Sequence, residues 1–77
     1  MSELQSNRLR KRSMVIAGHR TSLALEEPFW TALKEIAENR GLSLARLIAE
    51  IDATRSGNLS SVARLYVLDQ LRQAAKA

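Results

Sequence analysis

The chain has 77 residues, with 12 Lys and Arg against 8 Asp and Glu, a net charge of +4 and a sequence pI of about 10.4. A chain of this length forms one small domain that buries only roughly 60% of its unfolded surface, so its own core would be marginal. The sequence has no cysteine and a single histidine, which excludes disulfides and a zinc site built by one chain alone. We therefore expect no metal and no cofactor, and we expect oligomerisation to enlarge the core.

The positive charge is concentrated near the N-terminus. Residues 1–20 carry five basic side chains and one acidic side chain, whereas residues 21–77 carry seven of each. A cationic segment on a neutral body suits an anionic partner, most often a nucleic acid, and the alternative is a solvated tail that only aids solubility. Residues 1–12 are polar and charged, so we interpret them as a flexible basic arm, and its candidate phosphate ligands are Arg8, Arg10, Lys11 and Arg12.

No segment approaches the ~18 consecutive apolar residues of a membrane span. The apolar run 14–17 is also shorter than the core of a signal peptide, which has about 7–15 residues. We therefore expect a cytoplasmic protein that does not associate with a membrane.

Residues 13–77 have the pattern of one folded domain, which begins with extended chain. Residues 13–18 have strand character and end at Gly18. Residues 19–25 alternate, so that Thr21, Leu23 and Leu25 share one face of a strand. The opposite face of this predicted strand carries Arg20, Ser22 and Ala24.

Three helical patterns follow, over about 27–40, 43–54 and 59–74. The first begins with acidic residues and a proline and ends at Gly41, which we expect in a left-handed conformation. The second begins at Ser43, a favoured N-cap residue. The third is apolar on more than one side, so we expect it to pack on its own chain and on a partner. The predicted core, shared between the two chains of a dimer, comprises Leu23, Leu25, Phe29, Leu33, Ile36, Leu47, Ile48 and Ile51.

The strand at 19–25 needs a hydrogen-bonding mate, because its backbone donors and acceptors are otherwise unpaired. Residues 13–17 could fold back through Gly18 as a hairpin, or the same strand of a second copy could pair with it across a two-fold axis. The sequence Ala17-Gly18-His19 is not a strong two-residue turn, since Asn-Gly or Asp-Gly would be preferred. We therefore favour pairing with a second chain, which is compatible with a symmetric homodimer.

The sequence offers no catalytic constellation. Its glycines are isolated, it has no cysteine nucleophile, and its one imidazole, His19, lies among arginines. We therefore predict that the protein is not an enzyme. A two-stranded ribbon fits the major groove of B-DNA, where Arg20 could bind guanine, Ser22 could exchange a hydrogen bond and Ala24 could touch a thymine methyl group. The alternative is that this face is merely solvated.

The order strand, helix, Gly-Ser turn and helix resembles the ribbon-helix-helix superfamily, to which the Arc and methionine repressors belong. The segment 18–26 (Gly-His-Arg-Thr-Ser-Leu-Ala-Leu-Glu) and the later run 57–61 (Gly-Asn-Leu-Ser-Ser) look like a compact bacterial family of such domains. The resemblance implies a mainly helical fold with one short strand and an added C-terminal helix, in an intertwined homodimer. It also implies that the ribbon enters the major groove, that Arg20, Ser22 and Ala24 face bases, and that the amides at Ser43 and Leu44 hold a phosphate.

Two functions remain open. The first is sequence-specific binding of double-stranded DNA as a homodimer, as in a transcriptional regulator or repressor. The second is a protein-interaction dimer, antitoxin-like or an adaptor, which binds a protein partner through the third helix and binds DNA weakly or not at all. An exposed apolar patch at Tyr66, Val67 or Leu71 would favour the second function.

Overall fold

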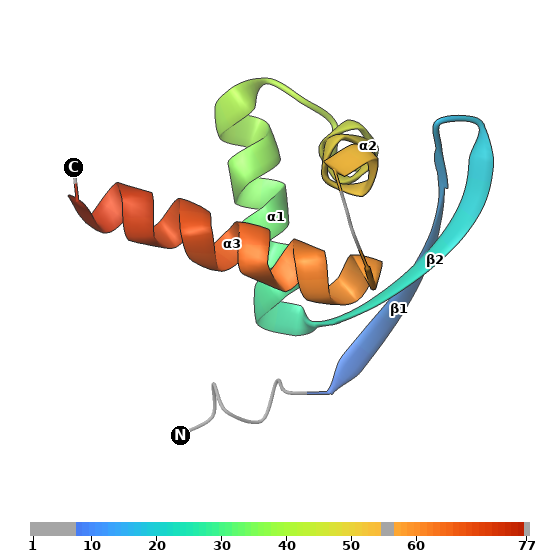
Figure 1. The fold of residues 1–77 in the computed structure, drawn as a ribbon, viewed down its shortest axis with the longest axis horizontal. Helices are drawn as coiled ribbons and strands as arrows, with labels where there is room; N and C mark the ends of the chain where they lie inside the picture. The colour runs from blue at the N-terminus through green and yellow to red at the C-terminus, as the bar shows by residue number, and fades with distance from the viewer. Residues whose placement is uncertain (1–7, 55–56, 77) are drawn as a thin grey trace.

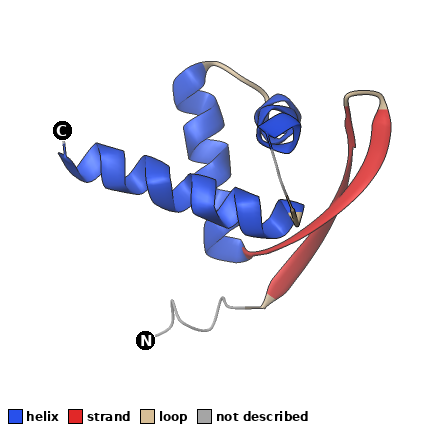
Figure 2. Cartoon of the chain, viewed as in Figure 1, coloured by secondary structure: helices blue, strands red, loops and turns tan. Residues whose placement is uncertain are grey.

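The chain folds as an antiparallel hairpin that lies across three helices (Figure 1 and Figure 2). This computed structural model describes residues 8–54 and 57–76. The fold class predicted from the sequence, a ribbon-helix-helix chain with an additional C-terminal helix, is confirmed. In chain order the elements are β1 (Leu9–Ile16), β2 (His19–Glu26), α1 (Glu27–Arg40), α2 (Leu44–Thr54) and α3 (Leu59–Lys76).

The strand β2 pairs with β1 of the same chain, so our prediction that its mate is a second copy is wrong. The register joins Leu9 to Glu26 at one end and Ile16 to His19 at the other. The strand does require a mate, and the chain supplies it through the hairpin that we considered as the alternative, which extends from residues 13–16 back into residues that we assigned to a flexible arm. That assignment is wrong for Leu9–Arg12, which form the first half of β1. Residues 1–7 of the predicted arm lie outside the described residues.

The turn between the two strands has a backbone geometry that its sequence does not favour, which is why the sequence does not predict the hairpin. Ala17 has a φ of 53° and Gly18 a φ of 84°, and positive φ at both positions of a two-residue loop is the geometry of a type I′ turn. Glycine adopts it without cost, whereas an L-residue with a side chain pays roughly 1–2 kcal/mol for left-handed backbone. The eight residue pairs of the ladder and the packing of the hairpin on the helices offset this cost at Ala17.

Replacing Ala17 by asparagine is expected to stabilise the protein by about 0.5–1 kcal/mol, because asparagine tolerates positive φ and Asn-Gly is the preferred type I′ pair. Urea denaturation followed by circular dichroism measures the change. Ala17→Val is the matched control, since a β-branched side chain at the same φ should destabilise the protein. An asparagine variant less stable than wild type would show that the turn is not of this type.

The hydrophobic core is formed within a single chain, between the inner face of the hairpin and the three helices. Trp30, Leu25, Leu33, Leu47, Ile48 and Val67 are its largest fully buried side chains. Of the eight residues predicted for a dimer core, Phe29 and Ile36 are half-buried against this cluster, and the other six lie inside it. Their burial therefore requires no partner.

The helix ends follow the sequence signals. Gly41 ends α1 with a φ of 70°, and the amide of Leu42 donates to the carbonyl of Ala37 at 2.8 Å, as in a Schellman C-cap. The hydroxyl of Ser43 accepts from the amide of Arg46 at 3.1 Å and begins α2. Asn58 caps α3 in the same way. In the two described ranges, no helix combines the length and apolar composition that a bilayer crossing requires.

Candidate nucleic-acid interface

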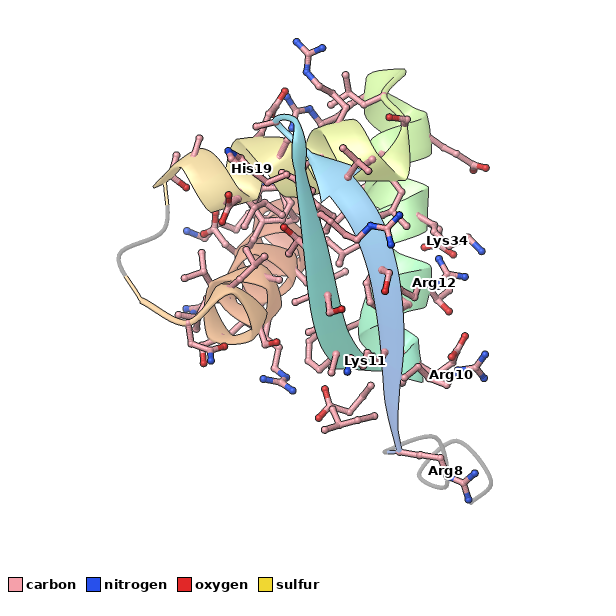
Figure 3. All side chains as sticks on the ribbon, turned by 90° about the vertical axis from the view of Figure 1, so that its right-hand side faces the viewer. Arg8, Arg10, Lys11, Arg12, His19 and Lys34 are labelled. Atoms are coloured by element: carbon pink, nitrogen blue, oxygen red, sulfur yellow. The ribbon has the colours of Figure 1, made fainter. Side chains whose placement is uncertain are left out.

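The hairpin turns one polar face toward solvent. Successive side chains of a strand alternate between faces, and the register therefore places Lys11, Ser13 and Val15 of β1 beside Ala24, Ser22 and Arg20 of β2, respectively. We call these six residues the outer face. All are exposed except Ala24, which is half-buried. Figure 3 views the hairpin on this side, with the helices behind it.

The outer face has the dimensions of a groove-binding ribbon. Paired strands lie about 4.8 Å apart, and residues two positions along a strand lie about 6.8 Å apart. The cross-strand pair that contains Lys11 and the pair that contains Arg20 are therefore separated by about 14 Å along the ribbon, which corresponds to roughly four base pairs at 3.4 Å each. Between them, the hydroxyls of Ser13 and Ser22 share a hydrogen bond across the strands at 3.4 Å. The face thus presents a cation at each end and hydroxyls in the middle.

Two of the predicted phosphate ligands lie along the edge of the hairpin rather than on its outer face. Arg10 and Arg12 alternate with Lys11, and they extend beside α1 on the side where Lys34 also lies (Figure 3). The guanidinium of Arg10 lies 3.6 Å from the carboxylate of Glu27. Arg12 lies 5.2 Å from the centroid of the Trp30 ring, within cation–π range. We call Arg10, Arg12 and Lys34 the basic rim.

The other predicted phosphate ligands, Arg8, Ser43 and Leu44, lie apart from the outer face. Arg8 lies just before β1, at the end of the hairpin far from the turn (Figure 3). Ser43 and Leu44 lie at the start of α2, in the helix layer, so they are not part of the outer face. The Ser43 hydroxyl already accepts one of the free amides of the first turn.

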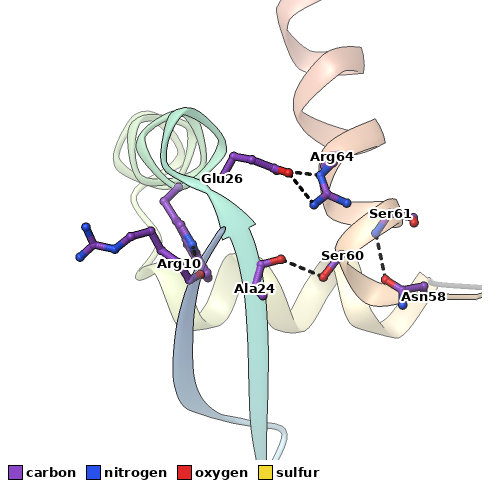
Figure 4. Close-up of polar contacts among 8 residues, drawn as sticks. Arg10, Ala24, Glu26, Asn58, Ser60, Ser61 and Arg64 are labelled. Atoms are coloured by element: carbon purple, nitrogen blue, oxygen red, sulfur yellow. Dashed lines mark hydrogen bonds and ion pairs between the residues drawn. The ribbon is translucent and has the colours of Figure 1, made fainter. Parts of the chain in front are cut away.

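Contacts with α3 hold the hairpin in this orientation (Figure 4). The hydroxyl of Ser60 donates to the carbonyl of Ala24 at 3.0 Å. Arg64 forms a bidentate pair with Glu26, at 2.9 and 3.0 Å. Hydrogen bonding from the Arg64 guanidinium lowers the pKa of the Glu26 carboxyl. The Ser60 bond also explains why Ala24 is less accessible than Arg20 and Ser22.

The indole of Trp30 holds β1 in place through a hydrogen bond. Its Nε1–H donates to the carbonyl of Arg10 at 2.9 Å, and the ring itself is only 2% exposed. One buried side chain therefore joins α1 to the start of β1, and its ring also lies beside Arg12.

Several residues of this surface were missed in the sequence. The sequence patterns do not indicate Ser13 or Lys34 as ligands, and they place Lys11 in a flexible arm rather than on a ribbon face. A usable signal exists for β1: counting back from a turn at Ala17-Gly18 places Lys11 and Ser13 opposite Ala24 and Ser22. No comparable signal exists for Lys34, because its proximity to Arg12 depends on how α1 packs on the hairpin.

Comparisons with known proteins agree with this architecture. The family described as "Ribbon-helix-helix domain" matches residues 9–71, from β1 into α3. The solved structure of an uncharacterized protein from Bordetella pertussis Tohama I is similar, with a TM-score of 0.76 and 30% sequence identity. The similarity covers 95% of this chain and 64% of that chain, so this chain spans less than two thirds of its length. No curated protein matches the chain.

Proposed function

The chain belongs to the ribbon-helix-helix family, which in general comprises DNA-binding regulators, and on this premise we propose that it binds double-stranded DNA and regulates transcription. The observation that supports the proposal is the outer face, a solvent-exposed two-stranded ribbon with Lys11 and Arg20 at its ends. The major groove of B-DNA is about 12 Å wide and accepts such a ribbon. The family is typically non-enzymatic, and we propose no reaction for this protein.

Each part of the surface has a proposed role in the complex. Arg20 donates two hydrogen bonds to guanine O6 and N7, Ser22 exchanges one hydrogen bond with a base edge, and Ala24 contacts a thymine methyl group. Ser13 extends the same row on β1, and Lys11, at the end of that row, contacts a phosphate. The phosphate contacts come from the basic rim and Arg8, which border the ribbon, and from the amides at Ser43 and Leu44.

A ribbon built by one chain changes the expected DNA target. When two identical strands form the ribbon, the bases that they face are related by a two-fold axis. Here β1 and β2 differ in sequence, so the proposed target of one ribbon is an asymmetric stretch of roughly four base pairs. The family generally acts as dimers, and we propose a homodimer here as well, assembled through another surface. Binding to chromosomal DNA would place the protein in the cytoplasm.

Selection of bound sequences from random duplexes at two salt concentrations tests this function. We expect a short enriched motif without two-fold symmetry, and an affinity that falls steeply with salt as cationic side chains release counterions from phosphates. Absence of duplex binding, or binding that does not respond to salt, would contradict the proposal. A palindromic motif with adjoining half-sites would instead support a ribbon shared by two chains.

A second candidate function is a protein-interaction module with weak DNA binding. The observation that favours it is a row of exposed leucines on α3. Of the residues named for this patch, only Leu71 is exposed, since Val67 is buried and Tyr66 is half-buried with its hydroxyl 3.3 Å from Arg40. These three residues therefore do not form one exposed patch, and the exposed apolar surface of α3 consists of Leu71 together with Leu65 and Leu68.

A further inference from the structure

The helix α3 has an apolar face that the fold leaves uncovered. Leu65, Leu68 and Leu71 are 64%, 49% and 57% exposed. We call these three residues the leucine stripe. The opposite side of the same helix packs into the core through Leu59, Ala63 and Val67, so about half of the surface of each leucine in the stripe is left uncovered by its own chain. Exposed leucines spaced three residues apart lie on one side of a helix and form an apolar strip suited to contact with another molecule.

The spacing of the stripe makes it complementary to itself. Leu68 lies three residues from each of the other two leucines. If a second copy of α3 packs antiparallel across a two-fold axis at Leu68, then Leu65 faces the partner's Leu71 and Leu68 faces its own counterpart. This reciprocal pairing is what a two-fold interface requires.

The charges beside the stripe also suit this arrangement. Asp69 and Arg72 both lie next to Leu68 along α3. In the antiparallel pair, Asp69 and the partner's Arg72 are separated by about five residues, or about 7.5 Å along the helix axis, a distance that an arginine side chain can span. The interface thus gains two interactions between opposite charges, one on each side of the two-fold axis. The same register places Arg64 level with the partner's Arg72, but Arg64 is already paired with Glu26 of its own chain.

The distribution of net charge supports a second copy as the occupant. Residues 27–77, which include the three helices, carry seven basic and six acidic side chains, so most of the excess positive charge lies in the hairpin and the residues before it. Figure 1 shows α3 running away from the hairpin toward the far end of the molecule. An antiparallel pair therefore places the two cationic hairpins at opposite ends, where their mutual repulsion is weakest.

We propose that the leucine stripe pairs two copies of this chain antiparallel through α3, and that the dimer binds two separate DNA duplexes. The binding of two duplexes rests on the proposed function. The outer face lies beyond the N-terminal end of α3 and is turned away from the helix (Figure 1 and Figure 3). A two-fold axis perpendicular to α3 reverses directions along the helix, so the partner's outer face points the opposite way. The two outer faces then point away from one another, so one dimer bridges two DNA segments rather than reading adjoining half-sites.

Analytical ultracentrifugation of the full chain tests the pairing. A stripe of this size belongs to the class of small, transient interfaces, so we expect reversible dimers with a dissociation constant of about 1–100 µM. Leu68→Arg places two like charges together at the axis and should weaken dimerisation at least about 10-fold. Leu9→Arg is the matched control, because Leu9 is 55% exposed but lies on β1. Circular dichroism verifies folding, and Leu68→Ala replaces Leu68→Arg should the latter unfold.

Cysteine cross-linking tests the direction of the pair, since the chain has no cysteine of its own. A mixture of the Leu65→Cys and Leu71→Cys proteins should oxidise to the mixed disulfide, while each protein alone should cross-link poorly. Preferential cross-linking within the Leu65→Cys protein alone would indicate a parallel pair and would overturn the proposal. A wild-type chain that remains monomeric at about 500 µM, well above the expected dissociation constant, or dimers that Leu68→Arg leaves intact, would also overturn it.

A duplex-capture assay tests the bridging. Beads carrying one duplex should retain a second, fluorescent duplex when wild-type protein is present. Leu68→Arg should reduce this retention at least about 10-fold while its binding to a single duplex stays within about 2-fold of wild type. Single-duplex binding without capture would overturn the bridging arrangement alone. Dimers without any duplex binding would instead contradict the proposed function and leave the α3 pairing supported.

Discussion

Replacing Trp30 by alanine is expected to lower the free energy of unfolding by about 3–5 kcal/mol, the range observed when a buried tryptophan is truncated. The ring is 2% exposed, and its removal leaves a cavity between the hairpin and α1. The change also removes the hydrogen bond from Nε1 to the carbonyl of Arg10 and the ring beneath Arg12. Since small domains have only about 5–15 kcal/mol of stability, this variant should be close to unfolding at room temperature.

Urea denaturation followed by far-ultraviolet circular dichroism measures this effect, because Trp30 is the only tryptophan and fluorescence is lost with it. Trp30→Phe keeps one aromatic ring in the core but loses the donor and part of the buried volume, so it should cost about 1–3 kcal/mol, less than Trp30→Ala. Tyr66→Phe is the matched control, since its hydroxyl contacts Arg40 at the exposed surface, and it should cost less than about 1 kcal/mol. A Trp30→Ala variant as stable as the control would contradict the burial of this ring in the core.

The second large effect is expected on DNA binding. The double variant Lys11→Ala, Arg20→Ala should weaken binding to the selected duplex by about 2–4 kcal/mol, or roughly 30- to 1000-fold. Arg20 contributes the larger part because a bidentate contact with guanine discriminates between bases by about 1–3 kcal/mol. Lys11 contributes mainly by contacting a phosphate. Its loss should therefore lower the number of counterions released on binding, which the salt dependence of the affinity reports, by about one. Both side chains are exposed, so the stability of the protein should change little.

Fluorescence anisotropy titrations at several salt concentrations measure these changes. The double variant Arg72→Ala, Lys76→Ala is the matched control, because it removes the same net charge from exposed positions near the other end of the molecule. Affinity of the control should stay within about threefold of wild type if position on the ribbon matters more than total charge. Equal losses in the two double variants would show that binding is a diffuse electrostatic attraction without a defined face.

The single-chain hairpin also changes how this member of its family is understood. The resemblance to the Arc and methionine repressors implies a ribbon that exists only in a dimer. Here β1 takes the place of the partner's strand, and the core is complete in one chain. Folding and ribbon formation are thereby separated from association. A second copy can then attach through another surface, such as the leucine stripe on α3.

The sequence by itself determined the order and limits of the three helices and the two faces of β2. Those features depend on local signals: alternation in 19–25, apolar spacing in the helices, and the glycine at position 41. Hence the alternation alone was enough to identify Arg20 and Ser22 as outward residues. The third helix could also be recognised as apolar on two sides, and the leucine stripe is one of them.

Only the tertiary structure decided which strand pairs with β2. The turn at Ala17-Gly18 is unfavourable by local preference, since alanine there has a φ of 53°. Contacts distant in sequence outweigh that preference, namely the full ladder and the bond from Trp30 to Arg10. The same contacts convert the cationic segment from an arm into β1 and place Arg12 over Trp30, one helical turn before Lys34 in α1 (Figure 3). Local patterns describe what a segment prefers, whereas pairing depends on the summed free energy of contacts that form only when the chain is folded.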